Sequence, residues 1–369
     1  MTDFFSDQAL ASLTDHLLPG LWPFIVAVIG CVVAVPLAIY LSRRFGWIAQ
    51  PGGRHAHSKP TPMLGGLAMY AGFALAVAIF LPGYGATPGV LIVSGLAMAA
   101  LAVDDRWPMH PLVKLAVQLA LALVAVVIFK VQIGWFSLPG GHLILLGLLE
   151  APVTVFWLTG MMNTVNFLDG ADGLAAGVIA IVALVLMLAA GELQQLEVVK
   201  LSGALAGCCV GFLLFNFPPA RIFMGDSGAH FLGMALGMIS ILGVAKVAVA
   251  FALAAPVLAL ALPIADTGWA ILRRRMQGSS VAAPDRLHLH HRLQSFGLDP
   301  RQTCYVFYSA SALLGALGLT LFGHGRILAV VLVAAAILTS TVVADLLLHT
   351  GWRMPAPWLR RLLRAPSSR

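Results

Sequence analysis

Residues 163–190 read NTVNFLDGADGLAAGVIAIVALVLMLAA, in which a segment rich in Asn and Asp leads directly into a long apolar run. Apolar runs of about 20 residues are typical of helices that span a membrane. Lipid offers no hydrogen-bonding partners to a peptide backbone, so such a run must satisfy its own N–H and C=O groups as a helix. The stretch therefore predicts a membrane helix with polar side chains gathered at one end.

Similar apolar runs recur along the whole chain. Of its 369 residues, 60% are hydrophobic and 10% are charged, whereas soluble domains carry about 25% charged residues. This composition excludes a soluble protein and predicts an all-α, polytopic fold that forms a single membrane domain over residues 1–369. We expect about eleven transmembrane helices, at residues 21–41, 63–82, 88–103, 111–130, 145–163, 173–190, 198–216, 229–244, 247–265, 303–322 and 327–348.

The Lys and Arg residues are distributed unevenly between the loops. With eleven spans, one side of the membrane carries all 22 Lys and Arg residues except Lys130, Lys200, Lys246 and Arg326. The positive-inside rule places the basic side in the cytoplasm, so we expect a periplasmic N-terminus and a cytoplasmic C-terminus. A signal peptide needs a basic start, which the first 20 residues lack, so the first helix is expected to be retained. The net charge of +7 suits anionic lipid headgroups, and nothing in the sequence indicates a nucleic-acid partner.

Ionisable residues fall mainly at the helix ends on the cytoplasmic side. Such residues are costly in a membrane and usually have a function. A transporter or lipid flippase, the alternative from another class of protein, is expected to carry charges near the midplane and broken helices that face both sides. The sequence lacks that pattern and predicts one charged site facing the cytoplasm, close to Asp104, Asp105, Asp169, Asp172, Asp226 and Asp266.

The first motif is Asp104-Asp105-Arg106, followed by Lys114. Adjacent carboxylates suit a magnesium ion, or one of them suits the role of a base. If the segment were one continuous helix, Lys114 would lie on a neighbouring face, nearly three turns deeper, and its stem would have to reach back toward the cytoplasm. The alternative interpretation is a capped helix with solvated acids.

The second motif, at residues 163–173, places Asn163, Asn166 and Asp169 near one helical face, because they are three residues apart. Asp172 follows between Ala171 and Gly173. Amide and carboxylate oxygens bind hard cations or read the edge of a base. The alternative is simple capping of a helix end.

The third motif, at residues 223–228, reads FMGDSG and sets Asp226 between two glycines at the start of a new span. Asp226 is a candidate cap for that helix. The positive end of the helix and its free N–H groups also favour a phosphate group.

Two further motifs are basic. Residues 267–302 form a predicted cytoplasmic loop that begins with Arg273-Arg274-Arg275 and contains an amphipathic interfacial helix from Leu289. Its histidines suggest a zinc site as an alternative, but there is no HExxH pattern and no nearby cysteine. Residues 54–66 contain Lys59 between prolines and glycines; the alternative is an ordinary basic loop beside the membrane.

Taken together and in this order, the five motifs resemble those of the polyprenyl-phosphate N-acetylhexosamine-1-phosphate transferases, over residues 40–350. The sequence HLHH at residues 288–291 is more similar to the His-x-His-His of the branch that makes undecaprenyl-diphospho-GlcNAc than to the triple His of the phospho-MurNAc-pentapeptide branch. The expected topology of eleven spans with the N-terminus outside also resembles that of the family.

The resemblance implies a role for each matching residue. It makes Asp104 the base toward the lipid phosphate and Lys114 a phosphate contact, and it implies magnesium ligation, with manganese as an alternative cation. We group Asp169 with the catalytic acids, and Asn163 and Arg274 with the substrate contacts; Asp172 and Phe223 match positions near the uridine. The predicted catalytic residues are Asp104, Asp105, Lys114, Asp169, His288, His290 and His291; the substrate-binding residues are Lys59, Asn163, Asp172, Phe223 and Arg274; the metal ligands are Asn166 and Asp226.

The resemblance implies a multi-pass enzyme of the bacterial inner membrane. The expected reaction transfers an N-acetylhexosamine 1-phosphate, with GlcNAc as the first choice, from a UDP-sugar to undecaprenyl phosphate and releases UMP. It would initiate O-antigen or another cell-surface polysaccharide, and a homodimer is a candidate assembly. The alternative within the class is the phospho-MurNAc-pentapeptide transferase of peptidoglycan synthesis. A CDP-alcohol phosphotransferase is disfavoured, because Asp169-Gly170 is followed by Ala171-Asp172 and not by Ala-Arg.

Overall fold

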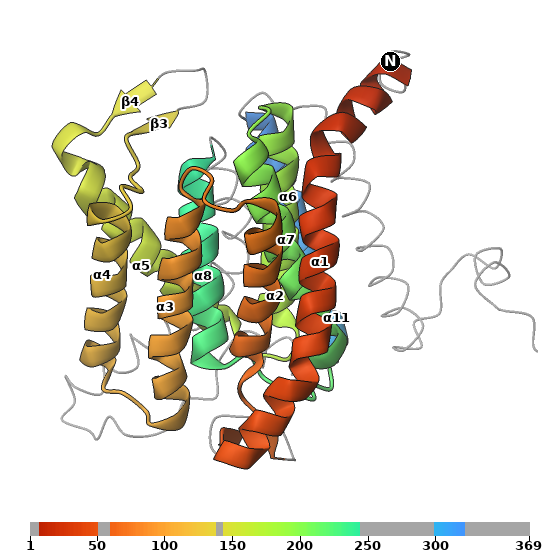
Figure 1. The fold of residues 1–369 in the computed structure, drawn as a ribbon, viewed down its shortest axis with the longest axis vertical. Coiled ribbons are helices and arrows are strands. Elements are labelled where there is room, and N and C mark those ends of the chain that lie inside the picture. Colours follow the sequence, from red (N-terminus) through yellow and green to blue (C-terminus); the bar gives the residue numbers. More distant parts are fainter. Residues whose placement is uncertain (1–6, 51–59, 138–142, 244–298, 322–369) are drawn as a thin grey trace, which may run out of the picture.

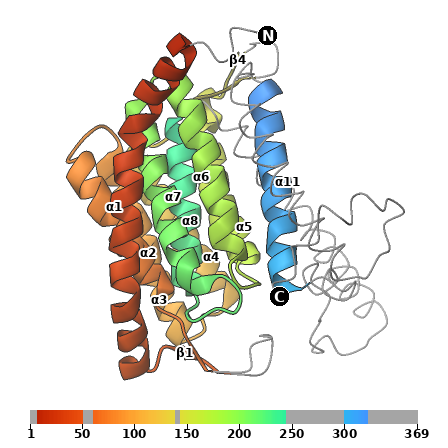
Figure 2. The ribbon, with the colours of Figure 1, turned by 90° about the vertical axis from the view of Figure 1, so that its right-hand side faces the viewer.

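The computed structural model describes residues 7–50, 60–137, 143–243 and 299–321, and these form a bundle of long helices (Figures 1 and 2). The elements within these ranges are α1 (Asp7–Phe45), β1 (Ile48–Ala49), β2 (Thr61–Pro62), α2 (Gly65–Phe80), α3 (Thr87–Arg106), α4 (Pro111–Val127), β3 (Trp135–Ser137), β4 (Leu143–Leu145), a 3₁₀ turn (Gly147–Leu149), α5 (Glu150–Leu168), α6 (Leu174–Glu192), α7 (Leu196–Asn216), α8 (Gly225–Leu242) and α11 (Pro300–Leu321).

The helices agree with the predicted class of fold. They overlap nine of the eleven predicted spans, and the other two, 247–265 and 327–348, lie outside the described residues. Among the described helices, four are long and apolar enough to cross a membrane, and two shorter apolar helices accompany them. The four are Leu18–Phe45, Thr87–Arg106, Leu174–Glu192 and Leu196–Asn216; the shorter two are Gly65–Phe80 and Pro111–Val127. The total number of spans and the sides of the two termini stay predictions.

The predicted span at 145–163 is wrong in its boundaries. Leu143–Leu145 is a strand, β4, that pairs antiparallel with β3. Gly147 then adopts a positive φ of 52°, which interrupts the chain before α5 begins at Glu150. The helix continues to Leu168, so Asn166 is helical. A second small antiparallel pair, β1 with β2, also departs from the all-α expectation.

Helix α8 forms the centre of the bundle. All but one of the 16 residues from Ser227 to Leu242 are buried, and both α3 and α5 pack against it. On the other side, α7 packs against α1 and α6, and α11 packs against α6. Figure 2 shows α7 and α8 enclosed between α1 on one side and α6 and α11 on the other. The ends of α8 are therefore held by neighbours on several sides.

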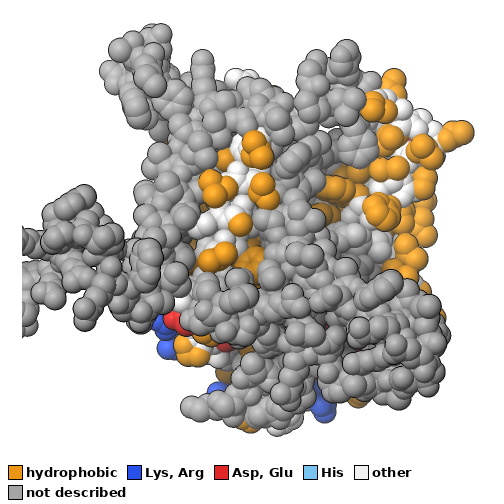
Figure 3. Space-filling model, turned by 180° about the vertical axis from the view of Figure 1, so that it is seen from behind, with side chains coloured by type: hydrophobic (Ala, Val, Ile, Leu, Met, Phe, Trp, Pro, Cys, Tyr) orange, Lys and Arg blue, Asp and Glu red, His pale blue; other side chains and the backbone are white. Residues whose placement is uncertain are grey.

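The outer faces of the bundle are apolar. Large hydrophobic side chains such as Val33, Leu112 and Phe156 are 70–80% exposed. In Figure 3 the apolar side chains extend over the upper part of the face in view, whereas the described charged side chains visible there lie toward its lower end. An apolar belt of this extent around helices of membrane-spanning length fits a lipid environment.

Close packing of α8 against α5 depends on Gly233. A Cβ atom at Gly233 would lie 2.6 Å from the Cα atom of Met162 and 2.7 Å from the carbonyl oxygen of Met161, so the backbone of α5 would have to move. Small residues of this kind let membrane helices approach one another closely.

We expect Gly233→Ala to destabilise the protein by about 1–3 kcal/mol, because an added methyl group overpacks the contact between two backbones. The matched control is Gly160→Ala on α5, where no described atom lies within 4 Å of the new Cβ position. The thermal midpoint in detergent should fall for Gly233→Ala and stay unchanged for Gly160→Ala. Equal midpoints would contradict the packing argument.

Candidate active site

The polar motifs meet at one end of the bundle. Helices α3 and α5 end there, and α4, α6 and α8 begin there (Figure 1). Each helix therefore contributes only its terminal turns to the site, while its apolar length lies along the rest of the bundle. This arrangement brings residues 104–114, 163–173 and 223–228 together, as the sequence predicted.

Lys114 lies between two carboxylates from different helices. Its Nζ atom is 3.0 Å from Asp104 Oδ2 and 2.5 Å from Asp226 Oδ2. Only 7% of the Asp104 side chain is exposed, against 32% for Asp226. The ammonium group thus holds α4 to α3 and α8 by charge-assisted hydrogen bonds, which are stronger than bonds between neutral groups.

The chain breaks between Asp104 and Lys114, in agreement with the separate predicted spans 88–103 and 111–130, so the geometry worked out for one continuous helix does not apply. Helix α3 ends at Arg106, the backbone turns, and α4 starts with Pro111 in its first turn. The backbone N–H of Met109 donates to Asp104 Oδ1 at 2.5 Å and stabilises the turn. Lys114 is consequently in the second turn of a new helix, directly opposite Asp104, and need not reach back from a deeper position.

Asp105 caps the start of α8. Its carboxylate accepts hydrogen bonds from the backbone N–H groups of Asp226, at 2.6 Å, and Ser227, at 3.1 Å. A carboxylate at a helix N-terminus satisfies free donors and complements the helix dipole. The preceding Gly225 has φ +71°, and a Cβ there would lie 2.6 Å from Asp105 Oδ2. The alternative in which Asp226 caps its own helix is therefore wrong, and two N–H groups expected to favour phosphate are already bound by Asp105.

Asn166 and Asp226 fit a magnesium ion. The amide Nδ2 of Asn166 donates to Asp226 Oδ1 at 2.5 Å, and turning the amide over would present its oxygen beside the same carboxylate. Within the described part of the chain, no group of three or more His, Cys, Asp or Glu side chains forms a metal cluster. Magnesium typically binds one or two protein oxygens together with substrate phosphates and water, and an Asn–Asp pair has that ligand chemistry.

Asn163 lies one turn below Asn166 and is engaged with Gln118 of α4. Asn163 Nδ2 donates to Gln118 Oε1 at 2.8 Å, and Gln118 Nε2 donates to Asn163 Oδ1 at 3.3 Å. Asn163 Nδ2 also donates to the carbonyl oxygen of Thr159 at 2.8 Å. The structure thus sets Asn163 beneath the acid–lysine cluster, with both ends of its amide bound inside the protein.

The loops that carry Asp172 and Phe223 are tied together. Asp172 Oδ2 accepts from the backbone N–H of Ala220 at 2.9 Å. Asn216, which is buried, accepts from the backbone N–H of Gly173 at 2.9 Å and donates to the carbonyl of Ile222 at 2.8 Å. The backbone N–H of Phe223 donates to the Pro62 carbonyl at 2.8 Å. Three loops far apart in the sequence therefore form one connected surface at the end of the bundle.

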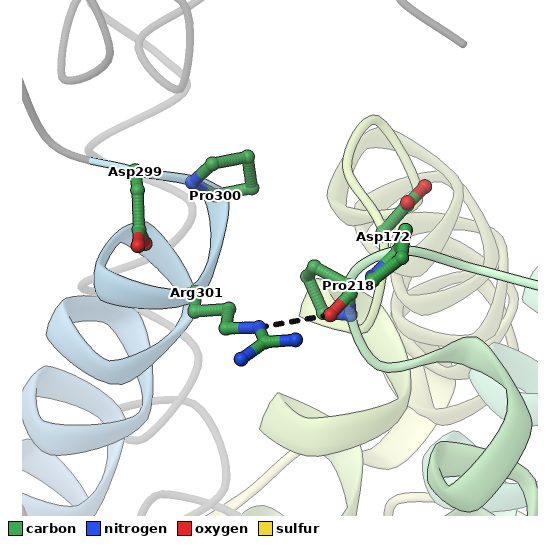
Figure 4. A pocket seen from close by; sticks show the side chains of 6 residues that line it. Asp172, Pro218, Asp299, Pro300 and Arg301 are labelled. Carbon is green, nitrogen blue, oxygen red and sulfur yellow. Dashed lines mark hydrogen bonds between the residues drawn. The ribbon is translucent and has the colours of Figure 1, made fainter. Parts of the chain in front are cut away.

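A pocket of about 290 Å³ opens beside this surface, at the start of α11 (Figure 4). Arg301 donates from Nε to the Pro218 carbonyl at 3.0 Å and forms part of the wall. The lining residues are Asp172, Pro218, Pro219, Asp299, Pro300 and Arg301. One of the predicted substrate contacts, Asp172, thus borders a cavity.

Asp169 ends α5 close to several other acids. Burial, together with the negative charges of Asp226, Asp105 and Asp172, raises the pKa of Asp169 well above the usual range of an aspartate. Like charges held this close repel one another, and a cation bound among them would relieve the repulsion. This electrostatic imbalance is the second observation that fits a divalent cation.

The other predicted site residues, Lys59, Arg274, His288, His290 and His291, lie outside the described residues, as does the predicted interfacial helix of the 267–302 loop. Conversely, the sequence reasoning missed Gln118, Asn216 and His230, which are at most 2% exposed and hydrogen-bonded around the site. A signal existed for two of them. Gln118 is four residues after Lys114, and His230 is four residues after Asp226, so each lies one helical turn from a predicted site residue.

Comparison with known proteins identifies the family of the chain. The profile of glycosyl transferase family 4 matches residues 87–244, which contain α3 to α8. The chain is 34% identical over 304 residues to a probable undecaprenyl-phosphate N-acetylglucosaminyl 1-phosphate transferase of Bacillus subtilis, covering 80% of this chain and 83% of the relative. It is 34% identical over 338 residues to a decaprenyl-phosphate N-acetylglucosaminephosphotransferase of Mycolicibacterium smegmatis, covering 81% and 82%.

A third relative, a phospho-N-acetylmuramoyl-pentapeptide-transferase of a Synechococcus strain, is 33% identical over 334 residues, which are 84% of this chain and 95% of the relative. The apolar helices, together with relatives that all come from bacteria, indicate a bacterial membrane protein. The chain belongs to glycosyl transferase family 4, within the polyprenyl-phosphate sugar-phosphate transferases.

Because the pKa of Asp169 is raised on folding, the stability of the protein is expected to depend on pH. In the unfolded chain an aspartate titrates near about pH 4. Between that pH and the higher pKa of Asp169 in the folded protein, the folded state binds more protons than the unfolded state. The free energy of unfolding therefore falls as the pH rises through this range. Asp169→Asn removes this penalty. In EDTA, the variant should have a higher thermal midpoint than the wild type at pH 8, and the difference should shrink toward pH 4. A difference that does not change with pH would refute the crowding of carboxylates.

Proposed function

We propose that this enzyme transfers N-acetylglucosamine 1-phosphate from UDP-N-acetylglucosamine to undecaprenyl phosphate, with release of UMP, as the first step of O-antigen or another cell-surface polysaccharide. The observation that carries the proposal is the position of Lys114 between Asp104 and Asp226, with Asn166 on the same carboxylate. One cation and several oxygen ligands at the end of an apolar bundle suit two phosphorylated substrates, one of which stays in lipid.

The chemistry requires two anions to approach each other. An oxygen of the lipid phosphate attacks the phosphorus next to the sugar, and the bond to UMP breaks. Catalysis of phosphoryl transfer consists mainly of positioning and charge stabilisation. Lys114 contacts two carboxylates and can exchange one of these contacts for a phosphate oxygen. The lipid phosphate would then bind next to Asp104 and Asp226, and both acids would stay close to the lysine.

Asp104 is the proposed base. Its Oδ1 is held by the backbone of Met109 and its Oδ2 by Lys114, so the side chain has a fixed orientation toward the approaching phosphate. The second ionisation of a phosphate monoester lies near pH 6, so a group that holds this proton matters most in mildly acidic conditions. Asn166 and Asp226 would hold magnesium, which supplies charge neutralisation of the diphosphate when bound.

The charged end of the bundle is proposed to face the cytoplasm of a bacterial inner-membrane protein. The support is the distribution of Lys and Arg, since the opposite side carries only four of the 22. A UDP-sugar is a cytoplasmic nucleotide, and the lipid phosphate reaches the membrane surface from within the bilayer. Both substrates can meet where the helices end.

The second candidate is transfer of phospho-MurNAc-pentapeptide. It is favoured by the Synechococcus relative, whose identity of 33% is nearly equal to the 34% of the N-acetylglucosamine relatives. The two reactions share the lipid acceptor and the UMP product, so the choice between them depends on the sugar side of the site. The HLHH sequence at residues 288–291 supports the N-acetylglucosamine reaction through its resemblance to that branch.

A direct assay distinguishes the two reactions. The purified full-length enzyme, given undecaprenyl phosphate and magnesium, should release UMP from UDP-N-acetylglucosamine and not from UDP-MurNAc-pentapeptide, because the donor pocket must distinguish a small sugar from a large peptidyl sugar. UMP release and the mass of the lipid product are measured. Turnover of UDP-MurNAc-pentapeptide alone would establish the second candidate, and turnover of neither would refute the proposal.

The metal requirement is tested separately. Asp226→Asn should lower the turnover rate at least 100-fold while the protein stays folded, because an amide is a weaker magnesium ligand than a carboxylate. The matched control is Glu150→Gln at the opposite end of α5, which should keep normal turnover. EDTA should stop the wild type, and added magnesium should restore it. Full wild-type activity in EDTA would rule out the metal, and an active Asp226→Asn would rule out this ligand.

A further inference from the structure

A second polar layer lies one helical turn below the first. We define the upper layer as Lys114, Asn166 and Asp226, and the deeper layer as Gln118, Asn163 and His230. Each of the helices α4, α5 and α8 contributes one residue to each layer, at a spacing of three or four residues. Helices α4 and α8 start at the site and α5 ends there, so all three deeper residues lie one turn farther along the bundle, away from the charged end. The repetition is thus a property of the three-helix interface and not of one helix.

The deeper layer is fully connected by hydrogen bonds. Gln118 and Asn163 form a reciprocal amide pair. His230 Nε2 lies 2.8 Å from Gln118 Nε2, and His230 Nδ1 lies 2.7 Å from the carbonyl oxygen of Asp226. The amide nitrogen of Gln118 donates, and so does His230 Nδ1 to the carbonyl, which assigns a neutral imidazole with an unprotonated Nε2. Gln118 of α4 therefore links α5, through Asn163, and α8, through His230, one turn below the upper layer.

Burial makes this layer costly to disturb. Gln118 is 1% exposed and His230 is not exposed at all. Buried polar groups that lose their partners are strongly unfavourable, whereas a completely satisfied network specifies one arrangement of its neighbours. A membrane helix can rotate about its axis at low cost when its contacts are apolar and interchangeable. Directional bonds between three helices remove that freedom.

We propose that the deeper layer is a positioning device: it fixes the rotation of α4, α5 and α8 so that the upper layer meets at hydrogen-bonding distance. We assign its members a positioning role, which for Asn163 replaces the substrate contact expected from the resemblance, because both ends of its amide are bound inside the protein. A rotation of α8 that moved the Asp226 carboxylate by about 1 Å would be expected to cost up to about 100-fold in rate. The inference rests on the proposed transfer reaction, in which the upper layer holds the reacting phosphates.

The test uses variants that separate hydrogen bonding from volume. His230→Leu keeps an apolar side chain of similar size but removes both nitrogen atoms, whereas His230→Gln restores a polar group at the end that faces Gln118. Gln118→Met removes the amide from the other partner and also serves if His230→Leu does not fold. The matched control is Trp157→Phe, which removes another hydrogen bond between α5 and α8, from Trp157 Nε1 to Ser240 Oγ at 3.1 Å, farther from the site.

Turnover rate, KM for the UDP-sugar and thermal midpoint are measured on equal amounts of folded full-length protein. We expect His230→Leu and Gln118→Met each to lower kcat by about 10- to 100-fold with a smaller change in KM, and His230→Gln to recover to within about threefold of the wild type. The double variant should be no slower than the slower single variant, because both changes break one network. Trp157→Phe should lower the midpoint by a similar amount and keep kcat.

A measurement that requires no turnover, the thermal midpoint with and without magnesium, separates this inference from the proposed function. Magnesium chloride should raise the midpoint of the wild type and of His230→Gln, and raise that of His230→Leu less. If the wild type transfers no sugar phosphate but shows this pattern, the proposed reaction fails and the positioning layer stands. Wild-type kcat in His230→Leu, failure of His230→Gln to recover, or losses that multiply in the double variant would each overturn the inference.

Discussion

The Lys114 ammonium group between two carboxylates is the contact on which the rest of the site depends. It joins the start of α4 to the end of α3 and the start of α8, so three helices that are apolar along their lengths converge in one place. The opposite charges do not cancel. Several acids lie near one lysine, and burial, reinforced by the negative charges of Asp226, Asp105 and Asp172, raises the pKa of Asp169. A cation bound among these carboxylates would relieve their mutual repulsion, which is the physical basis of the proposed magnesium requirement.

Much of the architecture could be predicted from apolar runs, because lipid leaves a spanning backbone no alternative to a helix. The same argument fails where a run passes into a loop. Residues 145–149 are as apolar as a span, yet Gly147 and the β3–β4 hairpin interrupt the chain, and hydropathy alone does not register a positive φ. The turn after Arg106 agrees with the gap between the predicted spans 88–103 and 111–130, but the spacing of Asp104 and Lys114 alone does not show that the turn brings them into contact.

The residues that form the site were easier to predict than the role of each residue. Asp104, Asp105, Lys114, Asn166 and Asp226 meet as the motifs indicated, because polar residues at helix ends on one side have few other places to go. The hydrogen-bond donor that each carboxylate binds depends on how the helices are rotated relative to one another and on the loops between them. Neither can be read from a single sequence. Asp105 was predicted to be catalytic, and in the structure its carboxylate accepts hydrogen bonds from the backbone of α8. Gln118 and His230 were overlooked because a polar residue within an apolar run has no partner until a second helix is placed beside it.

The two adjacent acids of α3 face different helices, Asp104 toward α4 and Asp105 toward α8. A sliding or tilting motion of α3 would therefore shift Asp104 and the anchor of Asp226 at the same time. The opposite face of α3 carries Ile92, Leu96 and Val103, which are 43–47% exposed on the apolar surface of the bundle. Helices adapt to bilayer thickness by tilting. A change in bilayer thickness that tilted α3 would therefore be transmitted to Asp104 and Asp105 together.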